Sequence, residues 1–432
     1  MKSKSKVTML VVAVLLSLLS SVNVQASQTG KCGDNITWTL DDKGNLELTG
    51  KGKMYGYSLM GAPWSTSIVS VTISEGIENI GKYAFSFCGK LTNVVIPNSV
   101  KEILEGVFRG CEGLKTVTIG ESVASIGKDA FSGCRELLSV IIPGAVKVID
   151  AKAFYNCGKV MSFIVDKENK VYDSRGNCNA IIETATNTLI YGCKNTVIPN
   201  TVTKIGEEAF AYCVALTSIE IPNSVTDIKS GAFSGCSGLT SVVIPSSVSN
   251  LGGHVFYGCE SLTSMVIPNS VKSIGAYTLY GCRGLKNVVV GESVASVGNA
   301  AFKECTGLTR LEMLTKVPPK CGKDVFVGVD KTACELVVPE GCVDAYKTAA
   351  EWGDFSKITP GESSVGEVGT QGVTVTAAGG EIVVEGVADA AVEVYGIGGS
   401  LLYSGKSHRV SVPVDGIYVV RVNGKPHKVV VK

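Results

Sequence analysis

The chain has 432 residues, of which 45% are hydrophobic and 18% are charged, a composition typical of folded proteins and not of disordered ones. Its formal net charge is +1, which becomes −2 without the three N-terminal lysines, because 37 basic residues then face 39 acidic ones. A balance this close to neutrality excludes the electrostatic signature of a nucleic-acid-binding protein, and we expect no nucleic acid as a partner.

The N-terminal segment, from Met1 to Ala26, has the pattern of a secretory signal peptide. Three lysines precede an apolar run at residues 7–19, and small or tolerated residues end at Ala26, where we expect cleavage. The apolar run is shorter than the ~20 residues that a membrane-spanning helix needs. We therefore expect a secreted mature chain without a transmembrane span.

A repeat with a period of about 23 residues dominates the rest of the chain. Its copies begin at Ile80, Ile103, Ile126 and Ile149 and, after an interruption, at Ile205, Ile228, Leu251, Ile274 and Val297. The interrupted step, from Ile149 to Ile205, is longer than two periods and shorter than three. We therefore expect an elaborated coil at residues 166–196 and not a break between domains.

Each copy contains one segment with the alternation of a strand. In the copy at residues 228–248, Leu239, Val242 and Ile244 point inward, and Pro245 ends the strand because proline lacks a ladder N–H. An Ala-Phe step places an aromatic ring in the core on the opposite side. The ring positions are Phe85, Phe108, Phe131, Phe154, Phe210, Phe233, Phe256 and Phe302, with Leu279 once. Stacked coils predict a mostly β member of the α/β solenoids, with one continuous core and one parallel sheet.

The pattern Ile-Gly-x-x-Ala-Phe…Cys…Leu-x-x-Val-x-Ile-Pro-x-Ser-Val resembles the BspA-type leucine-rich repeats of bacterial surface proteins. The resemblance covers about residues 71–359 and is specific, because nine copies share one register. Residues 27–70 resemble the family's N-terminal cap, and residues 314–360 resemble its final capping coil. The resemblance implies a leucine-rich-repeat solenoid at residues 71–360 and attachment to host proteins or other bacteria.

The C-terminal region has a different pattern. Residues 361–372 are polar and Gly-rich, which is typical of a linker, and alternating stretches at residues 373–432 predict a small antiparallel β-sandwich. Residues 394–399, 416–418 and the basic, apolar end resemble the C-terminal sorting domain of type IX secretion cargo. That resemblance implies surface attachment at an outer membrane, while a plain appended β-sandwich remains the alternative.

Nine of the 15 cysteines occupy one position of the repeat, which predicts a structural role. They are Cys88, Cys111, Cys134, Cys157, Cys213, Cys236, Cys259, Cys282 and Cys305. Equivalent side chains on adjacent strands lie ~4.8 Å apart, whereas a disulfide needs Cβ atoms ~3.8 Å apart. We therefore expect a ladder of buried free thiols. Disulfides are open for the six other cysteines, and Cys178–Cys193 is the pairing that we favour.

Residues for catalysis or metal binding are not apparent. The sequence has neither Cys-x-x-Cys nor His-x-x-x-His spacing, and its three histidines, His254, His408 and His427, have no nucleophile in a hydrolase motif. Acidic residues fall mostly in turns of a periodic surface, which offers no cleft for a carboxylate pair. We therefore expect no enzyme, no cofactor and no metal site.

The outward strand positions are the candidate ligand surface. They are Val95, Thr118, Ile141, Ile164, Glu220, Val243, Val266, Val289 and Glu312, beside a hydroxyl-rich row that includes Ser241 and Ser264. We expect Val243, Val266 and Val289 to form an apolar patch, because contiguous exposed apolar rows mark interaction sites. The alternative is that valine and threonine only suit strands. Residues 166–194 are a second candidate, because insertions in solenoids often project on the binding face.

Four functions follow from these features. The first is a cell-surface adhesin or protein-recognition surface, with host or bacterial surface proteins as partners. A carbohydrate-binding surface protein would need rows of exposed aromatic side chains, and the outward strand positions have none. A structural or self-associating coat component remains open, and an enzyme is disfavoured.

Overall fold

The computed structural model describes most of the chain. The described residues are 28–361 except 60, 65, 67 and 151, together with 374–378, 381–385, 391–396, 401–407, 409–411, 416–422 and 425–431. The expected signal peptide and nearly all of the expected linker lie outside these residues.

The N-terminal residues close the first end of the coil stack. Strands β1 (Gln28–Gly33), β2 (Ile36–Leu40) and β3 (Asn45–Gly50) pair antiparallel, and β5 (Ser70–Ile73) joins β3 in parallel. Below them Trp64 is buried, and its Nε1 donates a hydrogen bond to the Ala84 carbonyl at 2.8 Å. This indole covers Phe85, the first core ring, with ring centroids 6.0 Å apart, as an end cap of a solenoid must.

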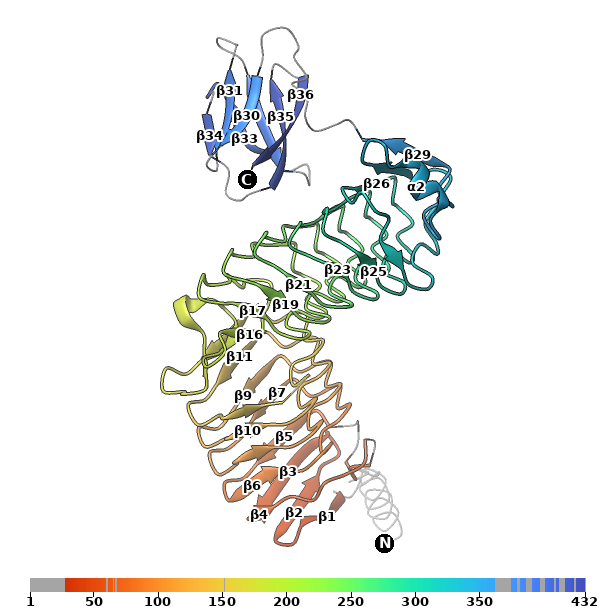
Figure 1. Cartoon of the computed structure of the whole chain (residues 1–432). Coiled ribbons are helices and arrows are strands. Elements are labelled where there is room, and N and C mark those ends of the chain that lie inside the picture. Colours follow the sequence, from red (N-terminus) through yellow and green to blue (C-terminus); the bar gives the residue numbers. More distant parts are fainter. Residues whose placement is uncertain are drawn as a thin grey trace, which may run out of the picture.

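The solenoid prediction is confirmed (Figure 1). Most coils contribute two short strands on two sides of the stack. We call the side with the longer strands, which lie in the Leu-x-x-Val-x-Ile segment, the wide sheet, and the side with mostly two-residue strands the narrow sheet. The wide-sheet strands are β7 (Asn93–Val95), β9 (Thr116–Thr118), β11 (Ser139–Ile142), β13 (Ser162–Val165), β18 (Ser218–Ile219), β20 (Ser241–Val242), β22 (Ser264–Ile267), β24 (Asn287–Val290), β26 (Arg310–Met313), β28 (Glu335–Val338) and β29 (Lys357–Pro360). The narrow-sheet strands are β4 (Gly52–Lys53), β6 (Ile77–Ile80), β8 (Glu102–Ile103), β10 (Ser125–Ile126), β12 (Val148–Ile149), β17 (Lys204–Ile205), β19 (Asp227–Ile228), β21 (Asn250–Leu251), β23 (Ser273–Ile274), β25 (Ser296–Val297) and β27 (Lys320–Cys321). The sequence predicted one continuous sheet on the wide side, but hydrogen bonding divides these strands into three sheets: β7-β9-β11-β13, β18-β20 and β22-β24-β26-β28-β29. The narrow side was not predicted, because strands this short show no alternation.

The third side of each coil, here called the turn side, carries the column of core rings. Phe85 and Phe108 stack with centroids 5.3 Å apart, and the Phe85 N–H donates to the Val107 carbonyl of the next coil. The residues two before and two after each ring have positive φ, for example Tyr83 at 54° and Phe87 at 59°. These left-handed residues make the tight bends, although the conformation costs a non-glycine residue roughly 1–2 kcal/mol.

The repeat cysteines form the predicted ladder of free thiols. Each thiol from the second coil of a block onward donates to a main-chain carbonyl of the preceding coil, as Cys134 does to Phe108 at 3.2 Å. The thiol therefore fills space and also satisfies a buried acceptor. Burial raises the pKa of Cys88 and of Cys305 to about 12.

The interruption divides the solenoid into two arms. Strands β14 (Tyr172–Asp173), β15 (Ile181–Glu183) and β16 (Thr188–Tyr191) form an antiparallel unit whose last strand joins the narrow sheet beside β17. Because side chains alternate along β15, Ile181 packs into the core of the first arm and Ile182 into the core of the second. The expected single core is thus two cores. We define the first arm as residues 28–165 and the second arm as residues 198–361.

The favoured disulfide in this region is wrong. Cys178 and Cys193 are both free thiols. Cys178 packs with the second arm and Cys193 with the first, because the antiparallel unit turns them toward different cores.

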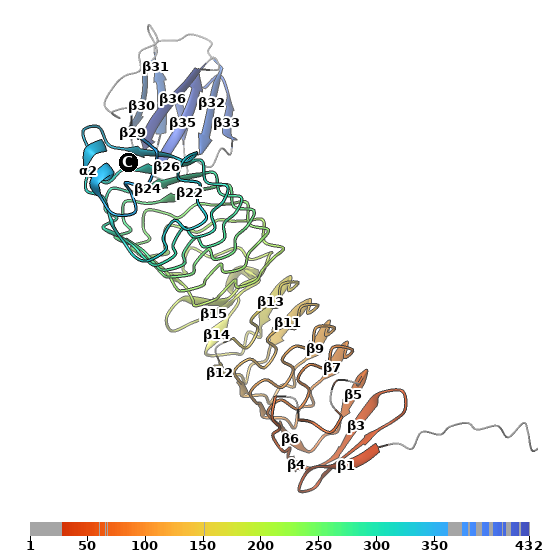
Figure 2. The same ribbon diagram turned by 90° about the vertical axis from the view of Figure 1, so that its right-hand side faces the viewer.

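The last coil carries helix α2 (Val343–Thr348) and the second end cap. Trp352 is buried against Phe326, and its Nε1 donates to the Pro319 carbonyl at 2.8 Å. Figure 2 shows α2 beside the end of the coil stack. Within the described residues, no helix combines the length and the apolarity that crossing a membrane requires.

The C-terminal strands form the predicted antiparallel sandwich. They are β30 (Thr374–Ala378), β31 (Glu381–Glu385), β32 (Val392–Gly396), β33 (Leu401–Gly405), β34 (Arg409–Ser411), β35 (Gly416–Val422) and β36 (Lys425–Val431). One sheet has the order β30-β31-β34 and the other β33-β32-β35-β36. Their shared core joins Ile382 and Val384 of the first sheet to Val394 and Val420 of the second.

Candidate functional site

The first arm exposes an apolar row on the wide sheet. We call the outward positions just before the Ile-Pro or equivalent step of each coil the outer sheet row. Its first-arm members include Val95, 63% exposed, Ile141, 58% exposed, and Ile164, 47% exposed. Ile141 and Ile164 are direct neighbours in the register of β11 and β13, and Thr118 on β9 is also exposed. The sequence therefore placed Val95, Thr118 and Ile141 correctly on an open face.

Polar and larger apolar side chains border this row. Asn93, Thr116 and Ser139 are exposed beside it, and the Thr116 hydroxyl donates to the Asn93 side-chain oxygen at 2.6 Å. Leu138 and Met161, at the start of the same two strands, are 36% and 39% exposed. An apolar centre with polar side chains around it is a feature that many protein–protein interfaces share.

The second arm does not present the patch that the sequence predicted. Val243 is 62% exposed, but Val266 is half-buried and Val289 is only 7% exposed. Val289 lies between Val266 and Glu312 in the register, and an ion pair with Arg310 at 3.5 Å holds the Glu312 side chain close to the sheet beside it. The predicted three-valine patch is thus reduced to Val243.

The hydroxyl row of the second arm is likewise only partly open. Ser241, beside Val243, is exposed, whereas Ser264 is half-buried. One member of the outer sheet row was not predicted. Val197 is 72% exposed and precedes Ile198-Pro199, but it lies between the two arms and outside any strand. The Ile-Pro step itself was the signal that could have identified it.

The elaborated coil is the second predicted binding surface. Its central charged groups interact with one another and with neighbouring side chains. The Arg175 guanidinium is ion-paired with Asp173 at 2.6 Å and donates to the side-chain oxygens of Asn187 at 2.8 Å and Thr201 at 3.2 Å. These contacts tie the insertion to the next coil. The charged groups at its centre therefore serve the local fold.

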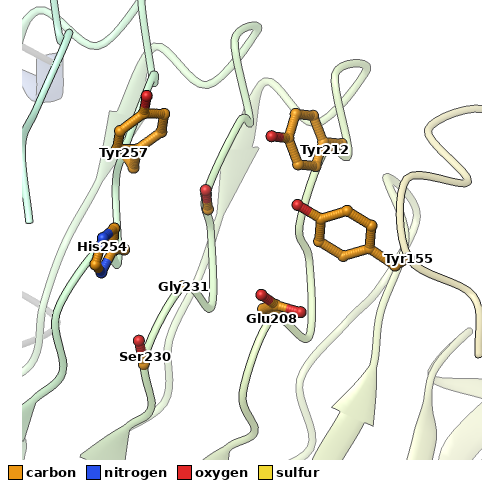
Figure 3. Close-up of a pocket in the computed structure, with 8 residues that line it drawn as sticks. Tyr155, Glu208, Tyr212, Ser230, Gly231, His254 and Tyr257 are labelled. Atoms are coloured by element: carbon orange, nitrogen blue, oxygen red, sulfur yellow. The ribbon is translucent and has the colours of Figure 1, made fainter. Parts of the chain in front are cut away.

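A hollow of about 490 Å³ lies on the turn side, where the two arms meet (Figure 3). Tyr155 and Tyr212 stand on one side of it, and His254 and Tyr257 on the other. The coil between these walls contributes only small residues, among them Gly231. The hollow thus arises because one coil lacks large side chains at positions where its neighbours have rings.

Contacts within the first wall fix its geometry. The rings of Tyr155 and Tyr212 meet edge to face at 5.2 Å, and Glu208 is ion-paired with Lys152 at 3.2 Å. Burial, followed by the hydrogen bond with Tyr212, raises the pKa of Tyr155. The Tyr155 hydroxyl is thus engaged with Tyr212 within this wall.

The hollow could not be predicted from the outward strand positions, because its residues lie outside the strands. Its residues flank the core rings by one, two or three positions. Tyrosine or histidine in several successive copies at those positions was the available signal. Among the described residues, no group of three or more His, Cys, Asp or Glu side chains could hold a metal ion.

Comparisons with known proteins agree with this architecture. A family profile described as the BspA type leucine rich repeat region matches residues 63–179 and 187–309 in six copies, which together exceed half of the chain. A leucine-rich repeat protein from Eubacterium ventriosum is 22% identical, with a TM-score of 0.58, covering 70% of this chain and 95% of that one. The pneumococcal vaccine antigen PcpA is 16% identical, with a TM-score of 0.55, covering 78% of this chain and 99% of that one. At these identities the two structures show the fold alone. The search of curated proteins gives no match.

Proposed function

Because the chain belongs to the BspA-type leucine-rich repeat family, we propose that it is a cell-surface recognition protein that acts as an adhesin and binds a protein partner. The observation that carries this proposal is the exposed outer sheet row of the first arm. Val95, Ile141 and Ile164 keep about half or more of their side chains in solvent. Contiguous exposed apolar surface of this kind tends to mark an interaction site.

The shape of the row favours a protein over a small ligand. The row runs from coil to coil along the sheet, and it has no enclosing walls. A broad, gently varying surface with an apolar centre and hydroxyl groups beside it suits a partner that covers many residues at once. The outer sheet row also lacks aromatic rings, which argues against sugar binding on this face.

The expected location of the protein completes the proposal. Export would follow from the N-terminal segment, with cleavage after Ala26, and retention at the surface from the C-terminal sandwich. N-terminal sequencing of the protein recovered from its native cells is expected to begin at Ser27. Deletion of residues 373–432 is expected to release the protein into the medium, and continued retention of that variant would contradict the anchoring role.

The binding site is tested by changing one exposed side chain. The exported chain, residues 27–432, is screened by biolayer interferometry against immobilised host matrix proteins and bacterial surface proteins. Ile141→Glu places a charge at the centre of the row, and we expect it to weaken a protein hit by at least about tenfold. Val317→Glu is the matched control, because Val317 is 77% exposed and lies outside the sheet.

Two outcomes would count against the proposal. One is an equal effect of Ile141→Glu and Val317→Glu, which would place the site elsewhere. The other is self-association of the chain as the only interaction in the screen, which would favour a structural coat component.

A further inference from the structure

Four rings gather on the turn side of the second arm, away from the outer sheet row. Tyr257 stacks on Tyr280 with centroids 4.9 Å apart and an interplanar angle of 5°, and His254 stacks on Tyr277 at 4.8 Å and 16°. The two stacks also contact each other, because the ring centroids of Tyr277 and Tyr280 lie 5.9 Å apart and those of His254 and Tyr257 lie 6.1 Å apart. None of these rings belongs to the core, which uses Phe256 and Leu279 in the same coils.

The hollow begins at the edge of this ring cluster. Tyr257 and His254 form its second wall, so the stacking behind them holds that wall in place (Figure 3). The facing wall is held too, because the Tyr212 ring lies on Gly235, where an added Cβ would come within 2.7 Å of it. Both walls are therefore preorganised.

The width of the hollow matches one ring-shaped ligand. The walls stand two coils apart, and each coil step separates core rings by 5.0 or 5.6 Å. Two strand spacings put the coils of Tyr212 and Tyr257 roughly 10 Å apart along the solenoid axis. A saturated six-membered ring that contacts a wall on each face at ~4 Å would occupy most of that space.

The chemistry of the lining suits a polyhydroxylated ring. Aromatic walls accept the C–H faces of a sugar, while the floor offers the hydroxyls of Ser230 and Ser234, and the first wall offers the Glu208 carboxylate. Such a mixture of flat apolar faces and a few polar groups is typical of small-ligand sites. Ser230 also donates to the Gly253 carbonyl at 3.0 Å, but its oxygen can still accept a hydrogen bond from a sugar hydroxyl, whereas an apolar peptide side chain would use none of these polar groups.

The charges in the hollow disfavour a cationic ligand, the other chemistry that aromatic walls can hold. Lys152 is ion-paired with Glu208 at 3.2 Å, and its Nζ lies 5.2 Å from the centroid of the Tyr155 ring. Lys152 thus neutralises the Glu208 carboxylate and occupies one face of the Tyr155 ring, which a cationic ligand would otherwise contact.

We infer that the turn-side hollow is a carbohydrate-binding site that takes one neutral pyranose unit of a glycan between Tyr212 and Tyr257. This site is separate from the outer sheet row and goes beyond the proposed protein recognition. The chain would then be able to bind a protein on one face and a glycan on another.

The test uses the exported chain and a microarray of neutral glycans built from glucose, galactose, mannose and N-acetylhexosamine units. We expect binding to at least one class, and Tyr257→Ala and Tyr212→Ala should each weaken it by about tenfold. Phe87→Ala is the matched control, because Phe87 occupies the Tyr212 position of its own coil, is 39% exposed and lies in the first arm. It should leave glycan binding unchanged.

A second variant separates binding from folding. Tyr257→Phe keeps the stack with Tyr280, so its glycan binding should stay within about threefold of the wild type. An array with no bound neutral glycan would overturn the inference. So would Tyr257→Ala that binds like the wild type, or a choline conjugate that binds more tightly than any neutral glycan.

Discussion

The two arms are built from the same repeat but expose different faces. The first arm leaves apolar side chains such as Ile141 open on the wide sheet, whereas the second arm covers the equivalent Val289. On the turn side both arms expose a ring, Phe87 at 39% in the first and Tyr277 at 37% in the second, and the second arm adds two stacked ring pairs around Tyr257 and Tyr277. The residues that recur in each copy therefore determine the core, whereas the residues that vary from copy to copy determine which face of each arm exposes apolar side chains.

The largest expected effect concerns the thiol ladder that both arms share. Burial raises the pKa of Cys88, in the first arm, and of Cys305, in the second, from 9.0 to about 12. The folded chain thus keeps protons that the unfolded chain releases above pH 9. The stability from each thiol is fully present below pH 9, and it falls by up to about 1.4 kcal/mol per pH unit as the pH rises toward 12.

Thermal unfolding measured by circular dichroism between pH 8 and pH 11 checks this prediction. The melting temperature should fall steeply above pH 9 in a single transition. A melting temperature that does not change over that range would contradict the prediction. So would two separate transitions, because thiols in both arms are expected to lose their stabilising effect over the same pH range.

A smaller but still large loss is expected from removing one core ring in either arm. Phe108 and Phe233 are fully buried. Each Phe→Ala change should cost about 3–5 kcal/mol in the free energy of unfolding, through lost burial and the cavity that remains. Urea unfolding of the two variants should give losses that agree within about 1 kcal/mol, and a much cheaper change in one arm would show that the cores are not equivalent.

The difference in exposure between the wide-sheet faces of the two arms can be tested by placing one charged side chain in each arm. Val289→Glu buries a carboxylate opposite Glu312, so it should destabilise the fold by roughly 1–3 kcal/mol. Ile141→Glu adds the same group to an exposed site and should change stability by less than about 0.5 kcal/mol. Differential scanning calorimetry of both variants would expose an error if their melting temperatures shifted equally.

The smallest effect is expected from the hydrogen bond of a single thiol. The Cys134 thiol donates to Phe108 at 3.2 Å, and the Cys259 thiol donates to Phe233 at 3.3 Å. Cys→Ala at either position should cost about 1 kcal/mol, because the carbonyl loses one of its two donors. Cys→Ser retains a donor, so a serine variant that unfolds more easily than the alanine variant in urea would argue that the bond contributes nothing.

The features that recur in each copy of the repeat could be predicted from the sequence. The column of core rings, the free thiols and the outward position of Ile141 all recur from copy to copy, so their burial or exposure follows from the repeat and its alternation alone. The narrow sheet escaped prediction because its strands, such as Ser125–Ile126, are too short to have an alternation of their own.

Other features depend on neighbours that no single copy contains. Val289 is only 7% exposed and is paired in the register with Glu312, which is ion-paired with Arg310, and a pattern of outward positions does not reveal these surroundings. The hollow needs rings from three copies and small residues from a fourth, so it appears only when four copies are placed side by side. The division of the core between Ile181 and Ile182 arises from an insertion that has no counterpart in the repeat.

Carbene footprinting read by mass spectrometry is the most direct test of the contrast between the arms. It labels side chains according to their exposure in the intact, ligand-free chain. Ile141 and Ile164 should be labelled strongly in the first arm, while Val289 stays protected and Tyr277 is labelled on the turn side of the second. Labelling of Val289 as strong as that of Ile141, or protection of Tyr277, would contradict the division of exposed faces between the two arms.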